Sequence, residues 1–298
     1  MSGIACALSL HDKFNVKIFE KSKGVGGRLC AKNTRQGLFH YGAQYCTAQS
    51  SAFQNFLIEN NAKYFLGSSF DMKTNSCIHS QNFFVGVNGM HSLIKNYNKI
   101  LSMHFNHKVI RVDERKKLVH FESGHTESYD IVISSLPLPQ AQEIFETEIV
   151  HDATFDPCIS VGMIFSGQTN NEHNAYKNIN QDISWLSSSK FYNTQNNETW
   201  VLQFSPQTSL EMFDYSNKSL EARCDDAVKD IIEGKYTIIH CGIFKWKFAL
   251  CKRSNLEKKF TSISDDAFAI GDWNISPRIE SAYISGKELG KFLTETQI

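Results

Sequence analysis

The chain has 298 residues, and its 31 lysines and arginines balance its 31 aspartates and glutamates, so the formal charge is zero. This length suits one large domain or two modest ones. A zero net charge disfavours nucleic acid and anionic membranes as partners, because both attract basic surfaces. No apolar run approaches the roughly 20 residues that a membrane-spanning helix needs. We therefore expect a globular protein that binds neither nucleic acid nor membrane.

Eight cysteines are spread along the chain, and none forms the C-x-x-C pair typical of a zinc site. The start of the chain, MSGIACALSLHDKF, has no basic segment ahead of its apolar stretch and does not resemble a secretory signal. Both features favour reduced thiols and a cytoplasmic location. The eleven histidines are scattered without an HExxH motif, so we expect no metal site.

The first 50 residues predict a helix, a strand and a glycine loop, in that order. Residues 2–10 are small and apolar, as in a buried helix, and residues 15–20 alternate like a strand. A loop with three glycines follows and ends directly before Arg28. The predicted helix starts immediately after Met1, so no strand precedes it in this sequence.

The hydrophobic pattern between residues 51 and 150 predicts two helices and three strands. The helices cover 51–60 and 89–101, and the strands cover 103–112, 117–122 and 130–134, with a hairpin turn at 123–125. The last of these strands is continuously apolar, as in a parallel sheet that is covered on both faces. Two prolines, Pro137 and Pro139, follow it and block further pairing.

The remainder of the chain changes character at about residue 151 and again at about residue 256. The middle predicts strands at 159–165, 200–204 and 236–248, a helix at 219–232, and surface loops at 168–180 and 187–198. The end returns to a strand at 267–270, a glycine turn and a helix at 279–293. This return predicts one nucleotide-binding domain that is interrupted by a substrate domain.

The N-terminal helix and strand match part of a dinucleotide-binding fingerprint. That fingerprint consists of a strand, G-x-G-x-x-G, a helix, a second strand and an acidic residue that binds a ribose. If Gly3 is its third glycine, Glu20 falls about 22 residues after the position of the first, near the expected gap of about 20. An alternative that these residues leave open is an amphipathic start whose Glu20 simply faces solvent.

Two further segments could bind phosphate or sugar groups. Gly26 and Gly27 permit backbone conformations closed to other residues, and Arg28 directly after them can pair with phosphate oxygens. A plain loop with a surface arginine is the alternative. Near the C-terminus, Gly271-Asp272 ends a buried strand, where the carboxylate could bind ribityl hydroxyls. The helix that follows could direct its N-terminal N–H groups at an anion, although it would also pack on a sheet without a ligand.

Together these segments resemble FAD-dependent oxidoreductases of the two-domain, glutathione-reductase-like type, and more narrowly the renalase and flavin-containing amine oxidase group. Four other segments share the resemblance: YGAQY at 41–45, FVGVNGM at 84–90, the strand end at 130–140 and KWKFA at 245–249. The resemblance therefore runs nearly from end to end.

The resemblance implies an α/β fold in which a Rossmann-like FAD-binding domain carries an inserted substrate domain of mixed β-sheet and helix. The FAD-binding domain would comprise residues 1–50, 95–150 and 256–298, and the substrate domain residues 51–94 and 151–255. The implied cofactor is FAD, and the implied cofactor-binding residues are Gly3, Glu20, Gly26, Gly27, Arg28, Ala43, Val109, Gly271, Asp272, Arg278, Ile279 and Glu280.

The resemblance also implies a reaction. Renalase-like enzymes oxidise misreduced dihydronicotinamide nucleotides by hydride transfer to flavin, with dioxygen as the acceptor, and the flavin carries the redox chemistry. Gln44 and Tyr45 would lie near the flavin ring, while Trp246 and Phe248 would line the pocket of this small-molecule substrate. Core packing stays open as the alternative for Trp246 and Phe248, because aromatic residues on strands usually pack.

Other functions remain open. A flavin amine oxidase often places a lysine near the flavin, but Lys245 and Lys247 would face away from Trp246 on an alternating strand. A flavin-free, non-catalytic relative is another alternative. An NAD-dependent dehydrogenase is disfavoured, because nothing replaces the Gly271-Asp272 element.

The sequence departs from the family pattern at its start. The first strand and the first two glycines of the fingerprint have no counterpart, and Met1 falls inside the fingerprint. Two interpretations follow: the start of the gene is misassigned and the chain is truncated, or the chain is natively short. A missing central strand would remove backbone donors to the pyrophosphate and expose strand edges.

Overall fold

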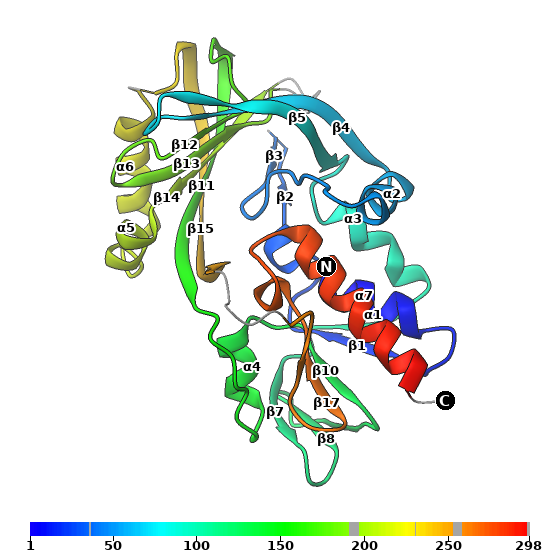
Figure 1. The fold of residues 1–298 in the computed structure, drawn as a ribbon. Coiled ribbons are helices and arrows are strands. Elements are labelled where there is room, and N and C mark those ends of the chain that lie inside the picture. Colours follow the sequence, from blue (N-terminus) through cyan, green and yellow to red (C-terminus); the bar gives the residue numbers. More distant parts are fainter. Residues whose placement is uncertain (36, 191–196, 230, 253–257, 297–298) are drawn as a thin grey trace. The chain divides into compact units, whose positions relative to one another are not determined.

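A computed structural model describes residues 1–35, 37–190, 197–229, 231–252 and 258–296 (Figure 1). The chain divides into two compact units. Unit 1 comprises Met1–Gly26, Ile94–Phe155 and Cys251–Ile298, and unit 2 comprises Gly27–Leu93 and Asp156–Leu250. The predicted boundaries differ mainly at residues 27–50, which belong to unit 2 and not to the unit of the N-terminal helix. The assignment of cofactor binding to one unit and substrate binding to the other stays a prediction.

Unit 1 combines short parallel strands with an antiparallel meander. Its elements are α1 (Ser2–Leu10), β1 (Lys17–Glu20), β6 (Ser102–Phe105), β7 (Val109–Asp113), β8 (Leu118–Phe121), β9 (Thr126–Ser128), β10 (Val132–Ser134), α4 (Leu138–Ile144), β16 (Thr261–Ser262), β17 (Ala267–Ala269) and α7 (Ile279–Thr296). The strand β1 pairs in parallel with β6, and β10 pairs in parallel with β17. The three strands β7, β8 and β9 form the meander.

The two long helices of unit 1, α1 and α7, lie side by side (Figure 1). Their apolar faces share a core with β17 that includes Leu10, Phe268 and Leu289. The backbones approach closely at Gly286, where an added Cβ would collide with the carbonyl oxygen of Ser2. Glycine is needed here because no side chain fits between the helices.

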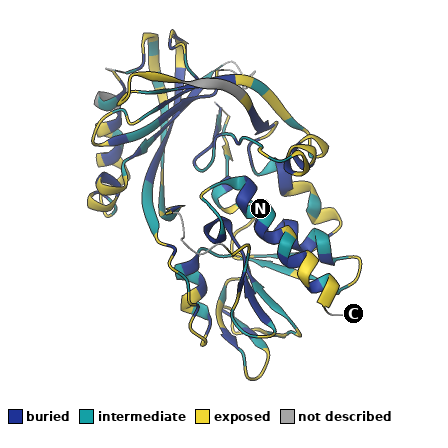
Figure 2. Cartoon of the chain, in the orientation of Figure 1, coloured by how far each residue is buried: buried dark blue, intermediate teal, exposed yellow. Residues whose placement is uncertain are grey.

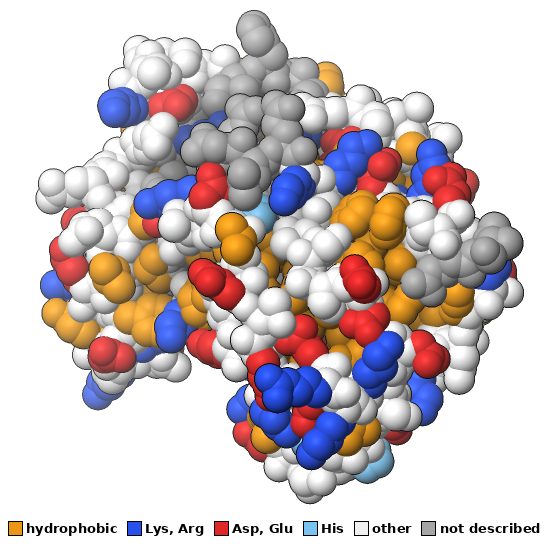
Figure 3. Space-filling model, turned by 60° about the horizontal axis from the view of Figure 1, so that its bottom comes forward, with side chains coloured by type: hydrophobic (Ala, Val, Ile, Leu, Met, Phe, Trp, Pro, Cys, Tyr) orange, Lys and Arg blue, Asp and Glu red, His pale blue; other side chains and the backbone are white. Residues whose placement is uncertain are grey.

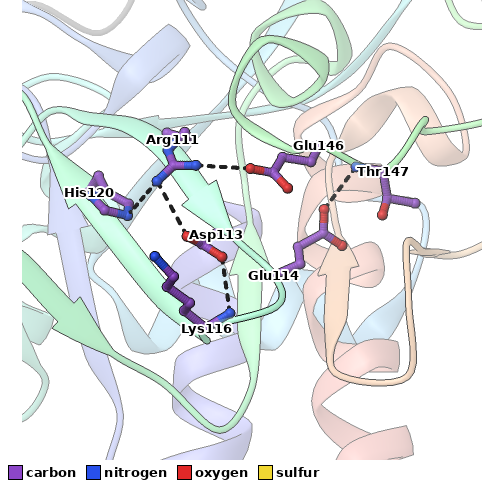
Figure 4. Close-up of polar contacts among 7 residues, drawn as sticks. All are labelled: Arg111, Asp113, Glu114, Lys116, His120, Glu146 and Thr147. Atoms are coloured by element: carbon purple, nitrogen blue, oxygen red, sulfur yellow. Dashed lines mark hydrogen bonds and ion pairs between the residues drawn. The ribbon is translucent and has the colours of Figure 1, made fainter.

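A polar network attaches the β7–β8 hairpin to the chain that follows α4 (Figure 4). The guanidinium of Arg111 donates to Glu146 at 2.9 Å, to Asp113 at 3.3 Å and to His120 at 3.0 Å. The backbone N–H of Lys116 and, secondarily, the charge of Arg111 lower the pKa of Asp113. Asp113 therefore stays ionised and keeps its pairing with Arg111 at neutral pH.

Unit 2 is built on a seven-stranded mixed sheet. Its elements are β2 (Lys32–Asn33), β3 (Leu38–Phe39), α2 (Ser51–Glu59), β4 (Ala62–Asp71), β5 (Ser76–Gly86), β11 (Phe155–Thr169), β12 (Ala175–Lys177), β13 (Ile183–Ser188), β14 (Glu198–Phe204), α5 (Pro206–Glu211), α6 (Asn217–Lys229) and β15 (Gly234–Cys251). The strand order is β15-β11-β14-β13-β12-β4-β5, with β12 and β4 parallel.

The helix α6 covers one face of this sheet, and its buried side packs on the apolar side chains of β11 and β14 (Figure 2). Leu220 and Val228 of α6 share this core with Val161, Met163 and Trp200. Successive residues of a strand point to opposite faces. The residues that alternate with this core therefore face away from α6, on the second face of the sheet.

Several predicted elements are wrong in extent. The helix expected at 89–101 is only α3 (Ser92–Lys95) and a 3₁₀ turn at Asn96–Lys99. The strand expected at 103–112 is two strands, because Asn106 between β6 and β7 adopts a left-handed conformation with φ 59°. The strand at 130–134 is parallel as predicted, but Val132 and Ile133 are only half-buried.

Two predicted loops also need correction. The segment 168–180 contains β12, whose Ala175 and Tyr176 are buried in the sheet. Part of the second predicted loop belongs to strands, since β13 extends to Ser188 and β14 begins at Glu198, while residues 191–196 lie outside the described residues. Short strands in polar surroundings carry little hydrophobic pattern, so their pairing partners decide their structure.

The surface agrees with the balanced composition. Figure 3 shows lysine and arginine side chains interspersed with aspartates and glutamates on one face of the molecule. Among the described helices, none combines the length and the apolar character that crossing a lipid bilayer requires. The described residues also contain no group of three or more His, Cys, Asp or Glu placed to hold a metal ion.

We predict that Gly286→Ala lowers the free energy of unfolding. The new methyl group would meet backbone atoms of Ser2 and Cys6, which cannot rotate away. Overpacking of this kind costs about 1–3 kcal/mol, more than the roughly 1 kcal/mol that alanine gains over glycine in a helix. Thermal and urea unfolding measure the effect. Gly24→Ala is the matched control, because nothing lies within 4 Å of its added Cβ. Equal stability of the two variants would contradict the close packing of α1 and α7.

Candidate functional site

Gly271 and Asp272 lie at the end of β17, where three segments of unit 1 meet. The N–H of Gly271 donates to Ser285 Oγ in α7 at 3.0 Å, and the indole N–H of Trp273 donates to Leu136 O at 3.1 Å. The Asp272 carboxylate is 6% exposed and accepts a hydrogen bond from Cys251 Sγ at 3.4 Å. The predicted Gly-Asp element is thus held by β10, α7 and the chain beside Cys251.

Gly3 reaches the same part of unit 1 from the N-terminus. An added Cβ at Gly3 would lie 3.0 Å from Ser135 Oγ, directly after β10. The adjacent Ser2 contacts Gly286, the neighbour of Ser285. Since Ser285 binds Gly271, the structure brings the predicted residues Gly3 and Gly271 into one region.

The start of α7 carries the predicted residues Arg278, Ile279 and Glu280. The helix begins at Ile279. The carboxylate of Glu280 is buried, with 3% of the residue exposed, and lies 3.6 Å from the Arg278 guanidinium. An arginine directly before the helix and a buried acid in its first turn therefore lie where helical N–H groups would favour an anion.

Glu20 and Val109 lie at neighbouring strand ends in unit 1. The Glu20 carboxylate accepts a hydrogen bond from the N–H of Ser22 at 2.8 Å. The backbone carbonyl oxygen of Glu20 accepts one from the N–H of His107 at 2.9 Å. Val109 begins β7 two residues after His107. Glu20, the residue predicted to bind a ribose, and Val109, another predicted cofactor-binding residue, are therefore close together through His107.

The glycine loop continues into the predicted Arg28. Gly26 and Gly27 have positive φ values of 138° and 53°, which explains why glycine is needed at both positions. The space beside Gly27 is open, because an added Cβ would meet nothing within 4 Å. The Arg28 guanidinium donates to the carbonyl of Ala249 in β15 at 3.0 Å. The sequence did not reveal this protein contact.

The segment His40–Tyr45 is a compact turn fixed by Gln44. The Gln44 amide N–H₂ donates to the carbonyls of His40, at 3.1 Å, and of Gly42, while its oxygen accepts the indole N–H of Trp185 at 2.9 Å. The imidazole of His40 donates back to Gln44 O at 2.9 Å. The polar atoms of Gln44 are thus engaged inside unit 2, as expected of a residue that positions its neighbours.

Tyr45 belongs to a small aromatic group on the second face of the sheet. Its ring stacks on Phe83 with centroids 4.0 Å apart, and the Trp185 ring lies 6.0 Å away. Trp185 reaches this face because a β-bulge at Ser184 interrupts the alternation of β13. Regular alternation would place Trp185 on the same face as Ile183, so the sequence pattern did not indicate its position.

The predicted Trp246 belongs to a second aromatic group. Its ring lies 4.4 Å from Phe244, which lies 5.6 Å from Tyr41. The indole N–H of Trp246 donates to Tyr41 O at 3.1 Å. Phe244 is 38% exposed, so this group reaches the surface of unit 2. Trp246 is therefore only partly a core residue.

Phe248 and the two lysines behave differently from Trp246. The Lys247 ammonium lies 5.4 Å from the centroid of the Phe248 ring. The Lys245 ammonium donates to the carbonyls of Phe213 and, at 2.7 Å, of Tyr215 in the connection between α5 and α6. Lys245 thus points away from Trp246, as the alternation of the strand predicts.

The titratable groups of the two aromatic groups are uncharged at neutral pH. Burial raises the pKa of Tyr41 to about 12 and also raises the pKa of Tyr45. Burial lowers the pKa of His40 to about 4, with a smaller lowering from nearby His91, although its bond to the Gln44 carbonyl acts in the opposite direction. The arrangement can bind an uncharged ring, but it supplies no charged group from these three side chains.

The donor set fits a flavin dinucleotide. Within unit 1, the acid at Glu20 and the buried Asp272 match the ribose and the ribityl chain of such a ligand, and Gly26 has the positive φ of a glycine loop that can approach phosphate. A buried amide nitrogen beside this element, Nδ2 of Asn274, has no hydrogen-bond partner among the described residues. The residue roles themselves stay predictions.

Comparison with known proteins identifies the family. The sequence model of the flavin-containing amine oxidoreductase family matches residues 1–63 and 47–240 of this chain. The chain belongs to this family. Its members are FAD-dependent oxidoreductases, which agrees with the predicted cofactor and reaction class.

Solved structures confirm the α/β fold with a mixed-sheet substrate domain. Putrescine oxidase with bound putrescine is 11% identical, with a TM-score of 0.76 over 99% of this chain and 97% of that chain. A protein described as a protoporphyrinogen oxidase from Exiguobacterium sp. 255-15 is 9% identical, with a TM-score of 0.79 over 98% and 96%. Reduced UDP-galactopyranose mutase is 9% identical, with a TM-score of 0.77 over 99% and 93%.

We predict that His40 makes the protein less stable in acid. Below about pH 6.5 the unfolded chain binds a proton at His40, whereas the folded chain does so only near pH 4. The free energy of unfolding should therefore fall through this window, by about 3 kcal/mol at pH 4. His40→Asn retains a donor for Gln44 O and should flatten this part of the curve. Urea unfolding at several pH values tests it, with exposed His125→Asn as the control. An unchanged pH slope in His40→Asn would contradict the buried neutral histidine.

Proposed function

We propose that the protein is an FAD-dependent oxidase that removes a hydride from a dihydronicotinamide nucleotide, as renalase-like enzymes do, and passes the electrons to dioxygen. The observation that supports this proposal is the pair of aromatic groups on the second face of the unit 2 sheet, which are Tyr45 with Phe83 and Trp185, and Tyr41 with Phe244 and Trp246. A dihydronicotinamide is a planar, uncharged hydride donor that needs no base. Aromatic side chains can hold such a ring by stacking, without a charged partner.

Bound FAD would supply the acceptor for the hydride, and dioxygen would take the two electrons with two protons to leave as hydrogen peroxide. In this proposal the chain binds and orients. Glu20 accepts hydrogen bonds from a ribose, and the N–H groups of Gly26 and Gly27 with the side chain of Arg28 hold phosphate. Trp246 and Phe244 exclude water from the reacting ring, and Gln44 keeps Trp185 in place.

Amine oxidation is the second candidate, and its support is the family and the putrescine bound by one structural relative. Lys245 does not favour it, because its ammonium is held by two carbonyl groups away from Trp246. A neutral surface also gives a protonated amine no anionic partner from Tyr41 or Tyr45. A flavin-free relative is the third candidate.

The visible absorption spectrum of the purified chain separates the third candidate from the others. If flavin is bound, anaerobic mixing with 2- or 6-dihydro isomers of NAD should bleach its absorption near 450 nm. Putrescine and other amines are tested in parallel. Bleaching by amines alone would replace our proposal with the second candidate, and a colourless folded protein would support the third.

We predict that Glu20→Ala weakens FAD binding about tenfold or more, because hydrogen bonds to a charged group contribute about 1.5–3 kcal/mol. Glu20→Gln retains an oxygen for Ser22 and the ribose and should lose less. Quenching of flavin fluorescence on titration of the apoprotein measures the affinity. Glu122→Ala, which removes an exposed acid paired with Lys108, is the control. An unchanged affinity in Glu20→Ala would remove Glu20 from the cofactor site.

We predict that Trp246→Ala slows flavin reduction by a dihydronicotinamide at least tenfold while the FAD content changes little. The ring would be lost from the surface that orients the substrate, and misplacement of a reacting group is costly. Stopped-flow absorption measures reduction, and the spectrum of the same sample gives the FAD content. Leu250→Ala, at an exposed position of the same strand, is the control. A normal rate of flavin reduction in Trp246→Ala would contradict a role in substrate binding and leave core packing as the role of Trp246.

A further inference from the structure

A row of polar and aromatic side chains crosses three neighbouring strands of unit 2. Ser160 of β11 is paired with Gln203 of β14, and Gln203 is paired with Trp185 of β13. Side chains of directly paired residues lie on the same face, with Cβ atoms about 5 Å apart. The three side chains therefore stand next to one another.

The row occupies the face of the sheet that lies away from α6. The flanking residues Val161 of β11 and Leu202 of β14 pack toward α6, so Ser160 and Gln203 point to the second face. Trp185 confirms the direction, because its indole binds Gln44 and lies beside Tyr45. The row is thus next to the turn His40–Tyr45.

The polar side chains in this region differ in their hydrogen bonding. The amide of Gln44 has partners on both its oxygen and its nitrogen, and it fixes the Trp185 ring. The half-buried side-chain amide of Gln203 has no hydrogen-bond partner among the described residues. The hydroxyl of Ser160 is fully buried and also has no partner among them.

The Gln203 amide is half-buried and has no partner among the described residues, so it is free to bind a polar group that reaches this face. A primary carboxamide carries the same set of groups as glutamine, one acceptor oxygen and two N–H donors. It can therefore form two hydrogen bonds with the Gln203 amide at once. A carboxylate offers only acceptors and an ammonium only donors, so each can form one of the two.

We propose that Gln203 is a specificity-determining residue that binds the carboxamide of the substrate, with Trp185 and Tyr45 beside the ring that carries it. This inference rests on the proposed dihydronicotinamide function and names the part of the substrate that unit 2 recognises. Gln44 is a positioning residue in this arrangement, because it acts through the indole of Trp185.

The first experiment measures the preference for a carboxamide over a carboxylate. Flavin reduction is followed in stopped flow with dihydronicotinamide nucleotide and with its dihydronicotinic acid analogue, both below saturation. Gln203→Met retains the length of the side chain and removes its amide. We expect the preference for the carboxamide to fall about fivefold, because the carboxamide loses one hydrogen bond more than the acid does, one hydrogen bond contributes about 1 kcal/mol, and tenfold corresponds to about 1.4 kcal/mol.

Two further variants keep this test decisive. Gln168→Met makes the same change at an exposed position of β11 and should leave the preference unchanged. Gln203→Glu retains the size of the side chain and can replace Gln203→Met if that variant does not fold. It should bind the carboxamide through one hydrogen bond and reject the acid analogue further, because two carboxylates repel each other.

A second experiment reads binding without any turnover. Nicotinamide is titrated into ¹⁵N-labelled protein, and the indole N–H signal of Trp185 is followed after its assignment with Trp185→Phe. Nicotinamide should shift this signal in the wild-type protein. In Gln203→Met, about tenfold more nicotinamide should be needed for the same shift. Nicotinate and putrescine should shift it less in the wild type.

The two experiments separate the inference from the proposed function. If dihydronicotinamides do not reduce the flavin, the proposed function fails, and the indole titration alone decides whether Gln203 binds a carboxamide. If they do reduce it, and Gln203→Met slows flavin reduction equally with the carboxamide and with the acid analogue, only the inference about Gln203 fails. An equal effect of Gln203→Met on putrescine and nicotinamide binding would also overturn it.

Discussion

The arrangement of the candidate site in unit 2 depends on one close approach between two backbone segments. The carbonyl of Arg28 accepts the N–H of Ala43 at 3.0 Å, and it lies where a side chain at Gly42 would have to be. This contact joins the glycine loop to the turn His40–Tyr45. The two aromatic groups follow from it, because Gln44 holds Trp185 and the carbonyl of Tyr41 holds Trp246.

The two units treat charge in different ways. In unit 1, charged groups are paired with one another, as in the Arg111 network and in the contact of Arg278 with Glu280. In unit 2, the second face of the sheet uses amides, indoles and hydroxyls, and burial keeps its tyrosines and His40 uncharged. A surface of this kind distinguishes ligands by hydrogen-bond pattern and shape, because it has little charge with which to attract them.

Sequence reasoning was strongest where a local pattern was enough. The helix α1 was predicted with its observed bounds, and α7 and β17 were recognised from apolar periodicity and the Gly271-Asp272 turn. The glycines at 26 and 27 were identified because positive φ values demand them. The hairpin β4–β5 was missed, since its strands alternate poorly and are stabilised by each other. Gln44 was predicted to lie near the flavin, yet its partner Trp185 is 141 residues further along the chain. No pattern in the sequence joins residues that far apart, and for the same reason Gln203 did not stand out.

The β-bulge at Ser184 has a consequence for how this protein can diverge. Ser184 is the extra residue between Ile183 and Trp185, whose partners Phe204 and Gln203 are consecutive, so Ile183 faces α6 while Trp185 faces the other side. The bulge can therefore absorb the loss of one residue: deletion of Ser184 leaves Trp185 opposite Gln203, and deletion of Trp185 moves Ser184 to that place while Leu186 keeps its partner Leu202. Among homologues, the residue opposite Gln203 would then report the ligand more directly than the length of this strand.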